Sequence, residues 1–227
     1  MTREIVLDTE TTGLDPVDGD RVVEIGCLEL FNHMPTGETF HVYINPQRDM
    51  PTAAFNVHGL SEDFLRTQPL FADVVGDFTD FIGDATLIAH NARFDMGFLN
   101  AELERAGRSL IPMAKVTDTL ALARKKFPGA PASLDALCRR FEIDNSKRTL
   151  HGALLDAELL AEVYLELVGG RQPGLTLAVN ATKTIAAAES VARPPRPHEP
   201  TPDELTAHEA FIREKVTDAM WLEERDS

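Results

Sequence analysis

Shortages of cysteine and of long apolar runs exclude whole classes of protein. There are only two cysteines in 227 residues, Cys27 and Cys138, and their wide separation in apolar surroundings fits neither a disulfide framework nor a metal-ligand pair. No run of about 18 or more apolar residues occurs, so we expect no membrane span and no membrane partner. The few residues before the first apolar run leave no room for a signal peptide. We therefore expect a cytoplasmic protein whose cysteines are reduced core residues.

Basic residues are also in short supply. The chain has 22 lysines and arginines against 37 acidic residues, a formal net charge of −15, which argues against a protein that binds duplex nucleic acid with its whole surface. An enzyme that approaches phosphates through bound metal ions is not excluded. Between Lys115 and Leu150 the balance reverses, with eight basic and four acidic residues. This basic stretch is either a solvated helical face or a local attraction for nucleic acid.

A hydrophobic content of 43% is enough for a core, and the apolar pattern predicts an α/β domain over residues 1–170. Strand-like runs come first, at residues 4–9, 21–31 and 38–44, with turns expected around 13–19 and 35–37. Further on, we expect helices near 61–65, 71–82, 94–103, 119–127, 133–141 and 154–167, and strands at 85–89 and around 116. The first three strands should form an antiparallel meander to which the later two add as parallel strands. The result would be a mixed five-stranded sheet with flanking helices.

The composition changes after residue 170. Five prolines crowd residues 194–202, and we expect a flexible linker over residues 171–200. A helix should begin at Thr201, a capping residue followed by a proline and, three positions on, by a glutamate, and it should run to about residue 222. Three of its apolar side chains lack a partner in the linker: Phe211, Ile212 and Trp221. The segment 201–227 is therefore predicted to dock on another protein.

The stretch VLDTETTGL, at residues 6–14, ends a buried strand with two carboxylates two residues apart. The side chains of Asp8 and Glu10 point to the same face of this strand, roughly 7 Å apart. Two partly desolvated like charges repel each other, and each raises the other's pKa unless a positive charge lies between them. A metal ion is the simplest such charge.

Two further acids stand where an ordinary surface acid would not. Asp95 lies at a helix start directly after a buried strand, and Asp156 lies on an apolar helix face. Four carboxylates at one point suit two Mg²⁺ or Mn²⁺ ions, and two such ions roughly 4 Å apart bind a phosphodiester, activate water and stabilise the leaving oxygen. His151, expected in the loop before the last helix of the domain, is suited to take a proton from the attacking water.

With these residues in place, the sequence resembles the DnaQ-like DEDDh 3′–5′ exonucleases, which have an RNase-H-like fold. The resemblance runs over residues 3–170 and rests on LDTETTGL, HNARFD and HGALLDAELLAEVY. It implies that the four acids hold two metal ions, that His151 is the general base, and that Asp118 supports the metal site from behind. It also implies a pocket for the 3′-terminal nucleotide, lined by Thr11, Thr12, Val57, His58, Asn91 and Phe94. His58 has an alternative role as a cap at a helix end.

Within this family the resemblance is closest to the proofreading subunits of bacterial replicative DNA polymerases, and it extends into the tail. It implies removal of mispaired nucleotides from a single-stranded or frayed 3′ end of DNA, and binding of the polymerase subunit through residues 201–227. The stretch 172–177 either resembles the short peptides that bind the bacterial sliding clamp, through Gln172, Leu175 and Leu177, or is plain linker. Two other functions stay open: an RNA-trimming exonuclease of the same family, and a structural subunit without catalysis, against which the four mutually repelling acids argue.

Overall fold

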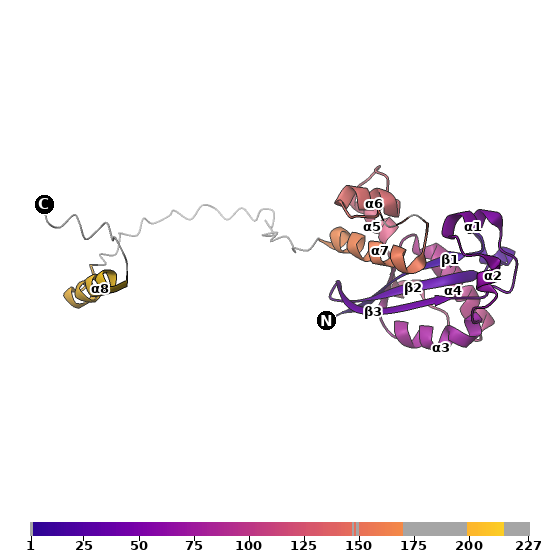
Figure 1. Cartoon of the computed structure of the whole chain (residues 1–227), viewed down its shortest axis with the longest axis horizontal. Coiled ribbons are helices and arrows are strands. Elements are labelled where there is room, and N and C mark those ends of the chain that lie inside the picture. Colours follow the sequence, from indigo (N-terminus) through magenta and orange to yellow (C-terminus); the bar gives the residue numbers. More distant parts are fainter. Residues whose placement is uncertain (1, 147, 149, 170–198, 216–227) are drawn as a thin grey trace, which may run out of the picture. The chain divides into compact units, whose positions relative to one another are not determined.

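The computed structural model describes residues 2–146, 148, 150–169 and 199–215, and the chain divides into two compact units, Met1–Leu175 and Thr176–Ser227 (Figure 1). The first unit holds a sheet and its flanking helices. In the second unit the described residues include one helix, α8 (Pro202–Lys215). Across the described ranges, no helix is both long enough and apolar enough to cross a membrane.

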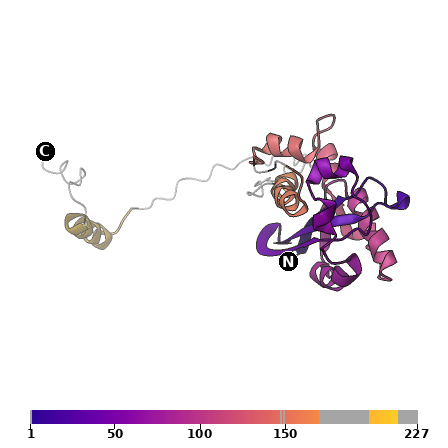
Figure 2. The same cartoon turned by 45° about the vertical axis from the view of Figure 1, so that its right-hand side comes forward.

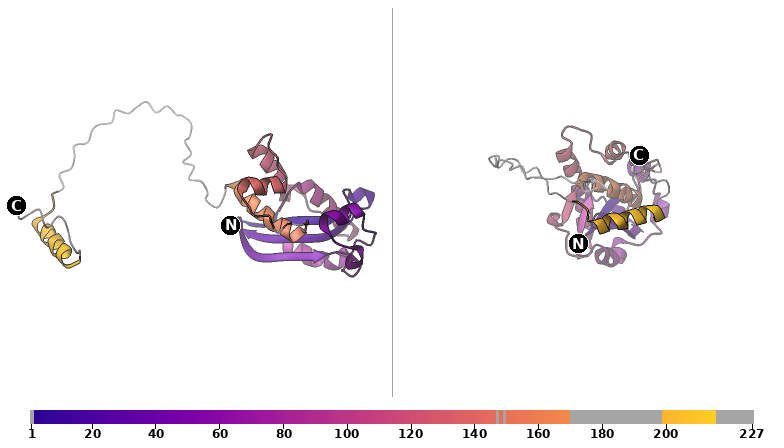
Figure 3. Two further views of the ribbon diagram at one scale, coloured as in Figure 1. Left: turned by 45° about the horizontal axis from the view of Figure 1, so that its top comes forward. Right: turned by 90° about the vertical axis from the view of Figure 1, so that its left-hand side faces the viewer.

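The first unit is built on a mixed five-stranded sheet of order β3-β2-β1-β4-β5. Its strands are β1 (Arg3–Thr11), β2 (Val22–Phe31), β3 (Met34–Tyr43), β4 (Thr86–Ala89) and β5 (Val116–Asp118). The pairs β1–β2 and β2–β3 are antiparallel, whereas β1–β4 and β4–β5 are parallel. Figure 3 shows the long N-terminal strands in indigo and purple side by side, with orange α7 over them. The predicted meander with two added parallel strands is confirmed.

The turn between β2 and β3 was predicted around residues 35–37, and this prediction is wrong. The chain turns at Asn32 and His33, whose φ angles are 51° and 67°, and β3 begins at once with Met34 paired to Phe31. Two consecutive positive φ angles define the type I′ hairpin, a conformation that asparagine tolerates. Pro35 lies inside β3 instead. Because β3 is an edge strand, its proline costs the sheet no interior hydrogen bond.

Seven helices accompany the described part of this sheet. They are α1 (Thr52–His58), α2 (Glu62–Leu65), α3 (Phe71–Ile82), α4 (Ala92–Arg105), α5 (Thr119–Lys126), α6 (Leu134–Phe141) and α7 (Ala153–Val168). Two short 3₁₀ turns lie at Pro16–Asp18 and Met113–Lys115. The sequence did not predict α1. This helix has only seven residues, no side-chain cap, and a single buried residue, His58, so it carries no apolar periodicity.

Helices cover both faces of the sheet, and alternate residues of β1 point into the two cores. Ile5 and Leu7 pack in one apolar cluster with α3 and α4. Val6 packs in a second cluster with α5, α6 and α7. In Figure 1 α7 lies above the strands and α3 below them, and Figure 2 shows the same order from a second direction. The parallel pairing also brings the carboxyl ends of β1, β4 and β5 to one end of the sheet, which is where ligands bind in open α/β folds.

The start of α8 carries the cap that its sequence predicts. Thr201 Oγ1 accepts a hydrogen bond from Glu204 N at 3.3 Å, and Glu204 Oε2 accepts one from Thr201 N at 2.8 Å. Two backbone N–H groups are thereby satisfied in the reciprocal arrangement of a capping box. The predicted helix end near residue 222 and nearly all of the predicted linker lie outside the described residues.

Candidate active site

A cavity of about 640 Å³ opens at the carboxyl ends of β1 and β4. It is walled by these strand ends, by the starts of α4, α5 and α6, and by the residues that lead into α7. The structure brings all five predicted catalytic residues to its lining: Asp8, Glu10, Asp95, His151 and Asp156. These side chains come from segments almost 150 positions apart, so the folding of the whole first unit assembles them.

Strand β1 contributes Asp8 and Glu10. Glu10 is buried, with 7% of its surface exposed, and its Oε1 has no hydrogen-bond partner among the described residues. A buried carboxylate oxygen without a donor is costly unless a cation neutralises it. Ligand atoms of Glu10, His151 and Asp156 lie within 4.8 Å of one another. The buried, unsatisfied oxygen of Glu10 and the nearby carboxylate of Asp156 fit a divalent cation, which prefers oxygen ligands.

The turn from β4 into α4 places Asp95. Asn91 adopts a left-handed conformation, with φ 64° and ψ 49°, and this unusual residue directs the chain sharply into the helix. Asp95 follows in the first turn of α4 and is 3% exposed. Thr9 Oγ1 donates a hydrogen bond of 2.8 Å to Asp95 Oδ1. This bond fixes the orientation of the carboxylate, a supporting role for Thr9 that the sequence reasoning missed.

Close packing of α7 on the sheet places Asp156. Gly26 pairs with Asp8 across β1 and β2. A Cβ atom added at Gly26 would lie 2.2 Å from Leu154 N and 2.3 Å from the Ala153 carbonyl carbon, so only glycine allows this approach of the helix backbone. The first turn of α7, which carries Asp156, therefore lies directly against the strand beside Asp8.

Three of the four acids have raised pKa values, and burial is the largest cause for each of them. Burial, followed by the charges of Asp156 and Glu24, raises the pKa of Glu10 to about 8. Burial raises the pKa of Asp95 to about 7. Burial and the charges of Asp95, Glu10 and Asp156 raise the pKa of Asp8 well above its usual value. Such a site binds protons or cations, and a divalent ion relieves the repulsion most effectively.

Arg148 provides a positive charge inside this acidic cavity. Its Nε and Nη2 atoms donate to the two carboxylate oxygens of Asp156 at 2.5 and 2.6 Å. Its Nη1 donates to Asp135 Oδ1 at 2.7 Å, and its Nη2 lies 2.8 Å from His151 Nδ1. Burial acts to lower the pKa of Arg148, but its hydrogen bonds and charge interactions, chiefly with Asp156, raise it above its usual value.

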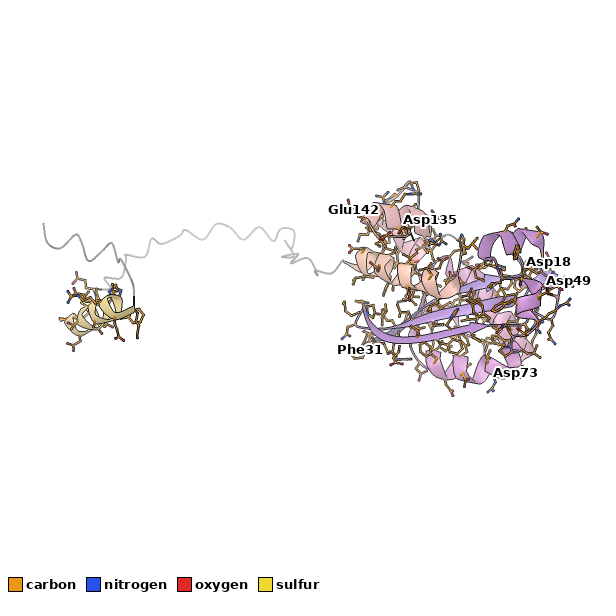
Figure 4. The ribbon with its side chains drawn as sticks, viewed as in Figure 1. Asp18, Phe31, Asp49, Asp73, Asp135 and Glu142 are labelled. Carbon is orange, nitrogen blue, oxygen red and sulfur yellow. The ribbon has the colours of Figure 1, made fainter. Side chains whose placement is uncertain are left out.

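The sequence reasoning counted Arg148 and Asp135 only as members of the basic stretch and its few acids. Asp135 lies in the first turn of α6 and is labelled in Figure 4. The available signal was its position at the end of the basic stretch, three residues before His151. Other members of the stretch are partly structural, because Arg140 lies 4.5 Å above the Phe127 ring and Lys126 bonds to the last carbonyls of α7.

The six predicted nucleotide-pocket residues fall into three pairs. Asn91 and Phe94 line the cavity. Thr11 and Thr12 are buried beside it, and their hydroxyl groups donate to Gly13 O and to Asp20 Oδ1 within the following loop. Nucleotide contacts of these residues stay a prediction.

Val57 and His58 lie at the end of α1. Val57 O accepts a hydrogen bond from His151 N at 3.1 Å, so α1 holds the backbone of the loop that carries His151. His58 Nδ1 accepts one from Leu60 N at 3.0 Å, which is the helix-end role that the sequence left open. Its Nε2 is buried without a partner among the described residues, so a contact with substrate also stays a prediction.

Asp118 occupies a supporting position behind the cavity. Its Oδ1 accepts hydrogen bonds from Leu120 N at 2.9 Å and from Asn91 N at 3.1 Å. The carboxylate thus caps α5 and ties it to the residue that starts α4. Because Asp95 lies in the first turn of α4, Asp118 acts on the acidic site through the backbone. Its role behind the metals stays a prediction.

The predicted binding segments of the tail are described only in part. Phe211 on α8 is 59% exposed, whereas Ile212 is 3% exposed. The other residues assigned to partner binding, Gln172, Leu175, Leu177 and Trp221, lie outside the described residues. Polymerase and clamp binding therefore stay predictions.

Solved structures with a similar fold are exonucleases. Exonuclease I of E. coli, in complex with a dT13 oligonucleotide, matches with a TM-score of 0.65 and 19% identity over 76% of this chain and 42% of that chain. Exonuclease X, in complex with 5′ overhanging duplex DNA, matches with a TM-score of 0.57 and 24% identity over 73% of this chain and 91% of that chain. At these identities the likeness shows the fold alone, and the predicted RNase-H-like architecture is confirmed.

The sequence pattern of the exonuclease (RNase_T) family matches residues 5–164, and this match defines the class of protein to which the fold and the acidic cavity belong. DNA polymerase III subunit epsilon of Rickettsia felis is 50% identical in an alignment that covers 92% of this chain and 95% of its own length. The subunit of the same name from Escherichia coli K12 is 45% identical in an alignment that covers 97% of this chain and 98% of its own length. The chain belongs to the exonuclease family and, within it, to the epsilon subunits of DNA polymerase III.

Proposed function

We propose that this 3′–5′ exonuclease removes mispaired nucleotides from the 3′ end of DNA as the proofreading subunit of the replicative polymerase. One observation carries the proposal: four carboxylates from β1, α4 and α7 meet His151 in a single cavity of a chain that belongs to the epsilon subunits. Four carboxylates in one cavity repel one another and destabilise the fold, and bound metal ions would neutralise this repulsion.

The residues that would hold the metal ions are Asp8, Glu10, Asp95 and Asp156. When bound, a pair of divalent ions supplies activation of water and stabilisation of the leaving 3′ oxygen. Carboxylate oxygens are the ligands that Mg²⁺ and Mn²⁺ prefer, so we propose two ions of either kind.

The chain's own residues position the reacting groups. Thr9 holds the Asp95 carboxylate by its hydrogen bond, and Gly26 lets α7 bring Asp156 beside Asp8. His151 lies in the loop before α7 with a side chain that is 46% exposed, and a ring nitrogen of this histidine would take a proton from the attacking water. Removal of that proton makes the water a stronger nucleophile toward the last phosphodiester.

We propose a single-stranded or frayed 3′ end as the substrate. Asn91 and Phe94 line the cavity and would contact the terminal nucleotide, with Phe94 offering a ring on which a base stacks. Arg124 also lines the cavity and gives local attraction for phosphate in an otherwise acidic chain. A protein of net charge −15 gains little from long duplex contacts, so only the last nucleotides should matter.

Partner binding belongs to the tail in this proposal. Residues 201–227 would bind the alpha subunit of DNA polymerase III, with Phe211, Ile212 and Trp221 as apolar contacts. Residues 171–200 would act as a flexible linker in which Gln172, Leu175 and Leu177 contact the sliding clamp. Since this assembly works on the bacterial chromosome, we propose that the protein acts in the cytoplasm.

Degradation of matched DNA and RNA oligonucleotides tests the function. The full chain is incubated with 5′-labelled single strands of the same sequence in Mg²⁺, with a chelator and the Asp8→Ala variant as controls. We expect stepwise release of mononucleotides from DNA, loss of activity in chelator, and a drop of at least ~10²-fold in the variant. Faster digestion of RNA would favour the RNA-trimming alternative. No metal-dependent release at all would favour a structural subunit.

A further inference from the structure

The contacts of Arg148 are unusual for a residue beside an acidic metal-binding cavity. Its guanidinium forms a bidentate pair with Asp156 at 2.5 and 2.6 Å, and the arginine side chain is only 9% exposed. A third bond joins it to Asp135 at 2.7 Å, and Nη2 lies 2.8 Å from His151 Nδ1. One side chain thus holds a proposed metal ligand and the proposed general base at the same time.

This arrangement conflicts with metal binding at the same carboxylate. A guanidinium has no acceptor atoms and keeps its full charge, so a divalent ion on Asp156 would lie close to a fixed positive charge in a poorly solvated site. His151 Nδ1 lies 2.8 Å from Arg148 Nη2 and 3.3 Å from Asp156 Oδ2, so the histidine packs against both members of this ion pair.

We propose that Arg148 competes with a divalent metal ion for Asp156, so that metal binding displaces the guanidinium from this carboxylate. The inference rests on the proposed metal ligands. In this view the chain carries its own counter-ion for Asp156, and the guanidinium holds this carboxylate until a metal ion takes its place.

Asp135 gives the displaced guanidinium a second partner. It lies on α6, its side chain is 46% exposed, and it already accepts a bond from Arg148 Nη1. Asp135 is not one of the proposed metal ligands. Arg148 is therefore able to leave Asp156 without losing every carboxylate contact, which keeps the cost of displacement low enough for a metal ion to overcome.

Calorimetric titration of Mn²⁺ into the full chain at one fixed pH tests the proposal. Loss of a charge-assisted bidentate pair corresponds to a change of ~10- to 100-fold, so Arg148→Ala should bind Mn²⁺ tighter than wild type by about that factor. Arg148→Lys keeps the positive charge but loses the planar guanidinium. Its Mn²⁺ affinity should therefore lie between those of wild type and Arg148→Ala. Equal or weaker Mn²⁺ binding by Arg148→Ala would overturn the inference.

Arg124→Ala is the matched control, because Arg124 lines the same cavity, is exposed, and has no bond to Asp156 among the described contacts. Removal of this screened charge should tighten Mn²⁺ binding at most about fivefold. An equal gain in both alanine variants would show a general charge effect and overturn the competition.

Thermal unfolding with and without Mn²⁺ is a second measurement. It distinguishes a change in Mn²⁺ affinity from poor folding of Arg148→Ala. In chelator, Arg148→Ala should melt below wild type because Asp156 loses its partner, and saturating Mn²⁺ should raise its melting temperature by more than it raises that of wild type. A smaller rise would overturn the inference. The proposed function has a separate test. It fails if the wild-type protein binds no Mn²⁺ and if Asp8→Ala leaves the nuclease activity unchanged.

Discussion

Substitution of Glu10 by glutamine should stabilise the metal-free protein at neutral pH. Burial first, and then the charges of Asp156 and Glu24, raise the pKa of Glu10 from 4.5 to about 8. Since the folded pKa lies above the unfolded one, the favourable contribution of the protonated side chain is fully present below pH 4.5 and is lost as the pH rises toward about 8. Glutamine has nearly the same shape and does not titrate.

The size of the effect follows from the same pKa values. Each pH unit between them corresponds to about 1.4 kcal/mol, so at pH 7 wild-type Glu10 costs about 3 kcal/mol relative to an uncharged side chain. Glutamine adds amide N–H groups that need partners, which reduces the gain. We expect Glu10→Gln to raise the free energy of unfolding by about 2 kcal/mol at pH 7 and, because the amide cost does not change with pH, to lower it by up to about 1 kcal/mol at pH 4.5.

Urea denaturation followed by far-UV circular dichroism, in chelator and at several pH values, measures this difference. Glu38→Gln on β3 is the matched control, because Glu38 is exposed. Saturating Mg²⁺ should reverse the order of the two proteins, since only the wild type keeps the carboxylate ligand. If the difference in free energy of unfolding between Glu10→Gln and wild type stayed constant from pH 4.5 to 8, Glu10 would not be a repelled, desolvated acid.

Three further outcomes are expected. His151→Ala should lower kcat by at least ~10²-fold while Mn²⁺ affinity in calorimetry stays unchanged, and a matching loss of affinity would make His151 a ligand instead. Arg139→Glu should weaken binding of a single-stranded oligonucleotide in a fluorescence anisotropy titration. Arg139 is chosen because its neighbour Arg140 packs on the Phe127 ring. Unaltered binding would show that the basic stretch is only a solvated helical face. Truncation after residue 170 should preserve nuclease activity on free oligonucleotides but abolish co-purification with the polymerase alpha subunit, and retained co-purification would disprove docking through the tail.

Periodicity predicted the sheet and the longer helices because apolar burial dictates both. The run Ile5-Val6-Leu7 is buried on both faces of the sheet, so its place in an inner strand follows directly from the sequence. In residues 71–82, aromatic and β-branched residues recur at helical spacing and so lie on one face. The helix α3 spans these same residues.

Local conformation and long-range contacts account for what the sequence did not reveal. The hairpin at Asn32–His33 depends on positive φ angles, and a more obvious Pro-Thr-Gly turn signal lies just after it. Gly26 looks like any strand glycine until α7 is seen against its backbone. The sequence showed Arg148 only as one of several positive charges, because its hydrogen bonds to Asp156 depend on the conformation of the loop between them. The acids themselves were predictable, since their residue types contradict their apolar neighbours.

The central claim is that four carboxylates on β1, α4 and α7 together hold two divalent ions at one cavity. A crystal structure of the chain grown with Mn²⁺ and a deoxynucleoside monophosphate, with anomalous diffraction data, tests this claim most directly. We predict two manganese peaks roughly 4 Å apart, each bound by at least one of Asp8, Glu10, Asp95 and Asp156. A single peak, or peaks bound away from these four carboxylates, would contradict the account.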